Sequence, residues 1–116
     1  MIVEKPWGWY LDLFRSNSLV KKILFIKSGE EISFQYHKKR SEFWRFLDGS
    51  ATVKLAMSEK ETPVTFSYFP GSTLEIAPYT LHQVIAKEND VIAYEVQTGE
   101  CEECDIVRVG IDKYGR

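Results

Sequence analysis

The sequence lacks several features that would point to particular classes of protein. Its 116 residues include no apolar run near the roughly 18 residues of a membrane span, so no membrane association is expected. Fifteen Lys and Arg are balanced by 17 Asp and Glu, for a formal net charge of −2. Non-specific nucleic-acid binding needs an excess of positive charge, so no nucleic-acid partner is expected. The N-terminus has no apolar stretch typical of a secretory signal, and a cytoplasmic location is therefore expected.

Cysteine is also scarce in this chain. The only two, Cys101 and Cys104, form a C-x-x-C pair with no histidine nearby. A structural zinc site needs more ligands than one such pair supplies. A C-x-x-C redox motif normally opens a helix within a β-α-β unit, and no such pattern surrounds this pair. We therefore interpret the two cysteines as free thiols.

A helical pattern is missing as well, because no segment of ten or more residues places its apolar side chains on one helical face. Aromatic residues are abundant instead, at 14% of the sequence, and they are typical of strands. Short apolar or alternating segments between turn residues predict strands at 9–14, 19–27, 31–36, 42–47, 51–57, 63–69, 73–77, 82–86, 91–97 and 106–109. This spacing predicts an all-β sandwich or barrel, with residues 1–116 as a single domain.

Both histidines stand on predicted strands, close to other potential metal ligands. Gln35 and His37 are two residues apart, so strand alternation points both side chains to one face. Glu42 opens the next strand after a turn that folds it back beside them, and His82 begins a distant strand after a turn with proline. Such nitrogen and oxygen ligands suit Zn²⁺ and other divalent transition metals. A histidine in a β-protein is more often a surface or core residue, and periodicity alone leaves both interpretations open.

The order of these residues resembles the first motif of the cupin family. The motif is carried by Gly29, Gln35, His37, Glu42 and Gly49, with Gln35 in place of the usual first histidine. The resemblance implies a single cupin β-barrel, also called a double-stranded β-helix or jelly roll. It also implies a divalent metal held by Gln35, His37, Glu42 and His82. Zinc is the first choice of metal, with manganese, cobalt, nickel and iron as alternatives.

A second cupin motif is present in altered form over residues 71–82. His82 keeps its expected distance from Gly71, but Tyr79 stands in place of a glycine and Ala86 in place of an asparagine. We expect the bulky Tyr79 to lie near the mouth of the pocket and to change its shape.

The similarity extends over nearly the whole chain to the type II mannose-6-phosphate isomerase domain. It is carried by segments 5–10, 20–23, 33–44, 95–99, 105–108 and 114–116, which include a Q-x-H-x-x-R-x-E-x-W pattern from Gln35 to Trp44. In many relatives this domain follows a sugar-nucleotidyltransferase domain. That partner is absent from the sequence, so guanylyltransferase activity is not expected.

The resemblance implies interconversion of mannose 6-phosphate and fructose 6-phosphate by proton transfer between adjacent carbons, with a sugar phosphate as the partner molecule. It assigns catalytic roles to Arg40 and Lys21, although alternation allows only one of Lys21 and Lys22 to face the interior. Tyr10, Arg40 and Glu95 are the expected substrate contacts. A homodimer is also expected, because a small barrel leaves edge strands uncovered.

Two other functions remain open at this stage. One is a nucleotide-sugar isomerase or epimerase on the same scaffold, which would use histidine as acid or base without a metal. The other is a non-catalytic cupin that binds metal and sugar, which the altered second motif favours. Trp7 and Trp44 either line the pocket or fill the core, and the core is the better interpretation of each because aromatic side chains bury large areas.

Overall fold

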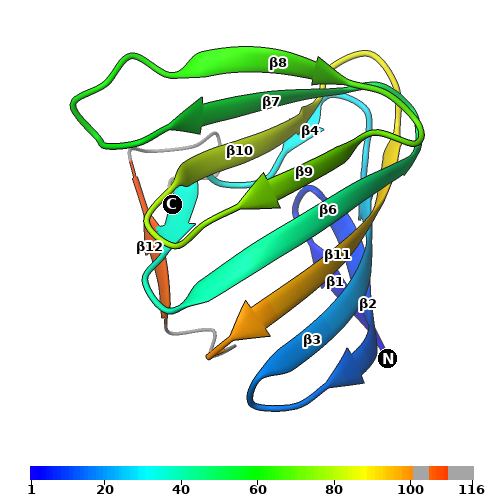
Figure 1. The fold of residues 1–116 in the computed structure, drawn as a ribbon. Coiled ribbons are helices and arrows are strands. Elements are labelled where there is room, and N and C mark those ends of the chain that lie inside the picture. Colours follow the sequence, from blue (N-terminus) through cyan, green and yellow to red (C-terminus); the bar gives the residue numbers. More distant parts are fainter. Residues whose placement is uncertain (101–104, 110–116) are drawn as a thin grey trace.

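The structure, a computed structural model, describes residues 1–100 and 105–109. The described part forms twelve strands (Figure 1). They are β1 (Ile2–Lys5), β2 (Gly8–Arg15), β3 (Leu19–Ile26), β4 (Glu30–Glu31), β5 (Gln35–His37), β6 (Arg40–Asp48), β7 (Ala51–Ala56), β8 (Val64–Tyr68), β9 (Thr73–Ile76), β10 (Leu81–Ala86), β11 (Val91–Gly99) and β12 (Ile106–Arg108). None of the described segments is a helix long and apolar enough to cross a membrane.

The strands form two antiparallel sheets, and the all-β prediction is confirmed. One sheet has the order β1-β2-β3-β11-β6-β9, and the other has the order β12-β5-β10-β7-β8, with β4 also paired to β10. In Figure 1, β8, β7 and β10 lie at the top of the view, and β9, β6, β11 and β3 follow below them. No ladder joins the two sheets among the described residues, so the barrel is not closed by hydrogen bonds.

The core lies between the two sheets and is contributed by both. In β3, β6 and β11, every second residue is buried, which is the pattern of a strand with one face toward a core. The buried apolar cluster consists of Leu24, Ile26, Ile32, Trp44, Phe46, Ala51, Val53, Leu74, Ile76, Val84, Ala86, Val91 and Ala93. Alternation therefore determines which residues of each strand reach the interior.

Most strand ends differ by a residue or two from those predicted, and three differences affect residues around the site. The predicted strand 31–36 is divided into β4 and β5, because the chain between Glu31 and Gln35 has one residue more than β10 offers between Ile85 and His82. The N-terminal β1 was not predicted, and it pairs with β2 as a hairpin. β6 begins at Arg40 rather than Glu42, so the Arg40 side chain points inward with that of Glu42.

Candidate metal centre and adjoining pocket

The interior of the protein changes from apolar to polar along single strands. On β6 the inward-facing residues are Phe46 and Trp44 and then Glu42 and Arg40. The same change occurs on β3 and β11, and the buried polar side chains at this end include Lys22, His37, Arg40, Glu42, His82, Glu95 and Gln97. Charged side chains are rarely buried unless they are paired. This dense group of buried polar and charged side chains therefore marks a candidate functional region.

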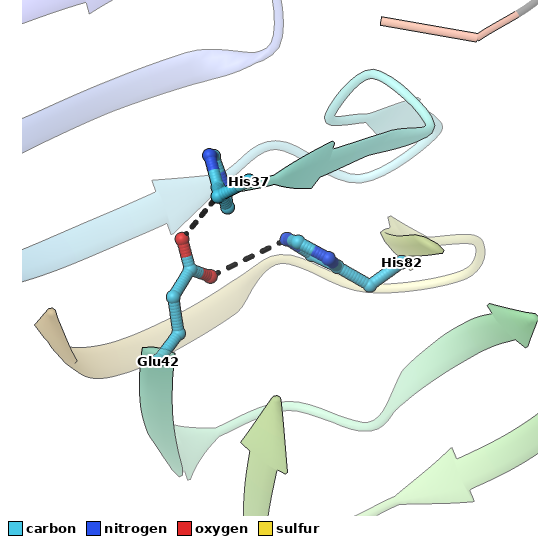
Figure 2. Close-up of side chains that lie close together, drawn as sticks. All are labelled: His37, Glu42 and His82. Carbon is cyan, nitrogen blue, oxygen red and sulfur yellow. Dashed lines mark ion pairs between the residues drawn. The ribbon is translucent and has the colours of Figure 1, made fainter. Parts of the chain in front are cut away.

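Three of the predicted metal ligands meet at the centre of this polar region. His37 comes from β5, Glu42 from β6 and His82 from β10, and each is at most 4% exposed. Figure 2 shows both imidazole rings directed at the Glu42 carboxylate, one at each oxygen. His37 Nε2 lies 2.9 Å from Glu42 Oε2, and His82 Nε2 lies 3.3 Å from Glu42 Oε1. One ligand atom from each residue lies within 4.8 Å of the others, so the three could share one ion.

The surroundings of His82 fit a metal ion. His82 Nδ1 lies 2.9 Å from the Thr80 carbonyl oxygen, which can only accept a hydrogen bond. In the neutral ring, Nδ1 therefore carries the proton and Nε2 carries a lone pair that faces Glu42 Oε1. Nε2 has no hydrogen-bond partner among the described residues. The lone pairs of His82 Nε2 and Glu42 Oε1 repel each other unless a proton or a metal cation lies between them. Metal-bound histidines typically donate their other N–H to a carbonyl, as His82 Nδ1 does here.

Two further side chains hold the Glu42 carboxylate in position. The Trp44 indole Nε1 donates to Glu42 Oε1 at 2.9 Å. Arg40 donates to Glu42 Oε2 through Nη2 at 3.1 Å and through Nε at 3.3 Å. Trp44 is thus a core residue, as expected, but one with a polar contact to a candidate ligand that sequence reasoning missed. The sequence did contain a signal for this contact, because Trp44 is two residues from Glu42 and strand alternation places both side chains on one face.

Burial and mutual contacts shift the pKa values of three groups. Burial alone would raise the pKa of Glu42, but the imidazoles of His82 and His37 beside it outweigh this effect and hold that pKa well below its usual value. Burial lowers the pKa of His37, although Glu42 partly opposes this. Burial raises the pKa of Glu95 well above its usual value, with Glu42 adding to the effect and Lys22 opposing it. The pKa values of the two carboxyl groups are therefore shifted in opposite directions, that of Glu42 downward and that of Glu95 upward.

A cavity of about 90 Å³ adjoins this cluster. Its lining contains four cationic side chains and one carboxyl, that of Glu95, among the described residues. The lining residues are Lys5, Trp7, Tyr10, Lys22, Leu24, Ile32, Ser33, Gln35, Arg40, Trp44, Glu95, Gln97, Ile106 and Arg108. His37, Glu42 and His82 are absent from this set, whereas Arg40, which contacts His37 and Glu42, belongs to it.

The structure brings most of the predicted site residues to this cavity. Tyr10, Gln35, Arg40 and Glu95 all line it. Gln35 is paired with His82 across the β5–β10 ladder, and its Oε1 accepts a hydrogen bond from the Ser33 hydroxyl at 2.6 Å. Its assignment as a metal ligand stays a prediction, as do the substrate contacts of the others.

The sequence left open which of Lys21 and Lys22 faces the interior, and the structure places Lys22 there. Lys22 is 6% exposed and lines the cavity, with its Nζ 4.2 Å from the centre of the Tyr10 ring. Lys21 lies on the opposite face of β3, because successive residues of a strand alternate. The expectation for Tyr79 needs correction. Tyr79 is not among the cavity-lining residues; it is 58% exposed and stacks on Tyr36, and its backbone has φ +67°, a conformation that explains why glycine is typical there.

The C-terminal strand contributes residues that sequence reasoning did not assign to the site. Ile106 and Arg108 of β12 line the cavity, and Arg108 pairs with Gln35 across the β5–β12 ladder. Asp105 fixes the start of this strand, since its carboxylate accepts hydrogen bonds from the backbone N–H groups of Lys38 and Lys39 at 3.0 and 2.9 Å. Cys101 and Cys104 lie outside the described residues.

Comparison with known proteins agrees with this geometry. The family model described as "Mannose-6-phosphate isomerase C-terminal" matches residues 1–111. A mannose-1-phosphate guanylyltransferase of Escherichia coli (strain K12) is 32% identical over 121 residues, which cover 98% of this chain and 23% of that protein. The chain thus spans about a quarter of the length of this curated relative.

Solved structures show the same fold at low sequence identity. The capsular polysaccharide assembling protein CapF from Staphylococcus aureus superimposes with a TM-score of 0.84 at 8% identity, covering 96% of this chain and 34% of that one. An oxalate decarboxylase from Lactobacillus farciminis gives a TM-score of 0.77 at 17% identity, covering 94% of this chain and 33% of that one. These similarities confirm the cupin fold.

Proposed function

The chain belongs to the mannose-6-phosphate isomerase C-terminal family, and from this premise we propose that it is a metal-dependent isomerase of mannose 6-phosphate and fructose 6-phosphate. One observation carries the proposal. Two buried histidines and a buried carboxylate converge within 4.8 Å beside a cavity lined by several cationic side chains and by Glu95. An aldose–ketose isomerisation needs a group that polarises the carbonyl, a base and a binding site for the phosphate.

His37, Glu42 and His82 would hold the metal, with Gln35 as a further candidate ligand. Zinc is the metal we propose, and manganese, cobalt, nickel and iron are the alternatives to test, because the ligand set suits all of them. Bound there, the metal would polarise the sugar carbonyl as a Lewis acid.

Glu95 is the group we propose as the base. It is the one carboxyl among the described cavity-lining residues, and it is 3% exposed. As a carboxylate it would take the proton from C2 of the aldose, and as a carboxylic acid it would return that proton to C1, while the hydroxyl proton passes from O2 to O1 to give the ketose. Burial raises its pKa, and a carboxylate with a raised pKa is a stronger general base.

Four cationic side chains are available for the oxygens of the substrate. Lys22 and Arg40 are buried in the cavity wall, where a charge that develops on the sugar oxygens would be stabilised most strongly. Arg40 Nη1 has no hydrogen-bond partner among the described residues and is a free donor for such an oxygen. Lys5 and Arg108 line the same cavity but are exposed, and we assign the phosphate to them.

The test is an isomerase assay on mannose 6-phosphate, with chelated protein and with protein reloaded with zinc. We expect activity only after reloading. Glu95→Gln should lower kcat by about 10²- to 10⁴-fold, the usual contribution of a general base, while zinc binding persists. His82→Asn should abolish zinc binding. Turnover of a nucleotide sugar by chelated protein would replace this proposal, as would binding of metal and sugar phosphate without turnover.

We also propose that the protein acts as a homodimer in the cytoplasm, where its sugar-phosphate substrates are formed. β8 is an edge of its sheet, and Val64 and Phe66 on it are 57% and 46% exposed. An uncovered apolar edge strand favours pairing with a second copy. Sedimentation equilibrium should give a dimer for the wild type and a monomer for Phe66→Glu. A monomeric wild type would overturn the dimer without affecting the isomerase proposal.

A further inference from the structure

The Arg40 guanidinium contacts the same atoms that a metal ion would use. Arg40 Nη2 lies 3.1 Å from His37 Nε2 and 3.1 Å from Glu42 Oε2. All three side chains are at least 96% buried, so bulk water does not weaken these contacts. A positive charge is thus already held between two of the three candidate ligands by this chain itself.

His37 Nε2 cannot serve both partners at the same time. Arg40 has only donors, so Nη2 can bond to His37 Nε2 only when that nitrogen carries a lone pair rather than the proton that a hydrogen bond to Glu42 Oε2, 2.9 Å away, would need. A ring nitrogen has one such lone pair in the plane of the ring, and a metal ion needs the same one. The Glu42 carboxylate is less restricted because each oxygen accepts more than one partner.

We propose that Arg40 and the metal ion compete for His37 Nε2 and Glu42 Oε2, so that metal binding displaces the guanidinium toward the cavity. The inference rests on the metal site of the proposed function. Arg40 already lines the cavity, so a rotation of its side chain moves Nη2 to the side where the substrate would lie. The metal would then both complete the centre and release a donor for the substrate.

The competition can be measured as zinc affinity, without any assay of activity. Arg40→Met removes the guanidinium and keeps a long apolar side chain, and should bind zinc about tenfold more tightly or better, the factor that corresponds to one charge-assisted hydrogen bond. The matched control is Lys22→Met, which removes another buried positive charge that lines the same cavity. Its zinc affinity should change less, because the Arg40 guanidinium that contacts His37 Nε2 and Glu42 Oε2 is still in place. Equal gains in both variants, or weaker binding by Arg40→Met, would overturn the competition.

A second measurement uses the wild type and does not depend on how the variants fold. The Arg40 Nε–H donates to Glu42 Oε2 at 3.3 Å and can be followed by nitrogen-15 NMR, with its signal identified by its loss in Arg40→Lys. Saturation with zinc should move this signal and speed its exchange with solvent about tenfold, since the protecting hydrogen bond is broken. An unchanged signal at full zinc occupancy would reject the displacement. If neither wild type nor His82→Asn binds zinc, the proposed function fails as well. If only the wild type binds it and the Arg40 signal stays unchanged, the competition alone fails.

Discussion

The two halves of the protein interior are built on the same strands but have opposite chemistry. On β11, Val91 and Ala93 belong to the apolar cluster, whereas Glu95 and Gln97, which continue the same buried face, line the cavity. In the apolar half, each buried side chain contributes favourable transfer free energy of about 25 cal/mol per Å². In the polar half, burial costs free energy unless every charge is paired. The difference teaches that this cupin keeps most of its apolar packing at one end of the interior and its candidate site at the other, with Leu24, Ile32 and Trp44 belonging to both.

The apolar half can be disrupted at Phe46, which is not among the cavity-lining residues. Phe46 is fully buried and packs on Trp44 and Tyr68, with ring centres 6.1 and 5.2 Å away. Phe46→Ala should lower the free energy of unfolding by about 3–5 kcal/mol, the usual cost of removing a buried aromatic ring. Chemical denaturation of the chelated protein measures the loss.

Zinc affinity of the folded Phe46→Ala protein should stay within about twofold of wild type if the halves are independent. The control is Leu47→Ala on the same strand, which is 44% exposed and should change stability by about 0.5 kcal/mol or less. A large loss of zinc affinity in Phe46→Ala would show that the apolar half positions the ligands and that the comparison is too simple.

A substitution in the polar half should have the opposite effect on stability. Removing the Glu95 carboxyl should stabilise the fold at high pH. Glu95 has a pKa raised mainly by burial, so the folded protein keeps a proton that the unfolded chain loses above the usual pKa of 4.5. The stability from this group is therefore complete below pH 4.5 and falls as pH rises toward the raised pKa. Each unit of pKa difference between the folded and unfolded states corresponds to about 1.4 kcal/mol.

Glu95→Gln stays neutral at every pH and should lack this loss. In chelated protein, wild type and Glu95→Gln should be about equally stable at pH 4, and the variant should be the more stable at pH 8. His37, whose pKa is lowered by burial, gives a slope of opposite sign, but it is present in both proteins and cancels in their difference. The control is Glu75→Gln, an exposed carboxyl of β9, which should follow wild type throughout. A variant less stable than wild type at pH 8 would show that Glu95 supports the fold.

Much of the site could be predicted from the sequence because strand alternation and turn signals are local. The two-residue spacing of Gln35 and His37, and the turn before Glu42, predicted that these residues share a face. The structure confirms that His37 and Glu42 meet, and that His82 joins them from a strand far along the chain. The distant partner came from the resemblance to the second cupin motif, since no local rule places residue 82 beside residue 37.

The remaining contacts depended on register, which local patterns do not determine. Arg40 was expected in a turn between two strands, but β6 begins at Arg40, and this one boundary places its side chain on the inner face. Arg108 lines the cavity because β12 pairs with β5, a pairing between segments about 70 residues apart. The β1–β2 hairpin was missed although Ile2 and Val3 favour a strand, because a four-residue strand carries too little pattern to detect.

The smallest effect that we predict concerns Lys21 and Lys22, where the sequence pattern was ambiguous for a physical reason. The inner face of β3 carries Leu24 and Ile26, but its outer face is apolar as well, since Phe25 stacks on Trp9 with ring centres 5.5 Å apart. Both faces of β3 therefore look like a core face in the sequence, and the pattern does not show which lysine points inward.

Lys22→Met should lower kcat/KM for mannose 6-phosphate by about 10- to 100-fold, the effect of losing one charge-assisted contact. Lys21→Met should stay within about twofold of wild type, because its side chain faces away from the cavity. The same kinetic assay on both variants shows which lysine contacts the substrate. A larger loss of kcat/KM in Lys21→Met would mean that the substrate approaches from the outer face of the sheet.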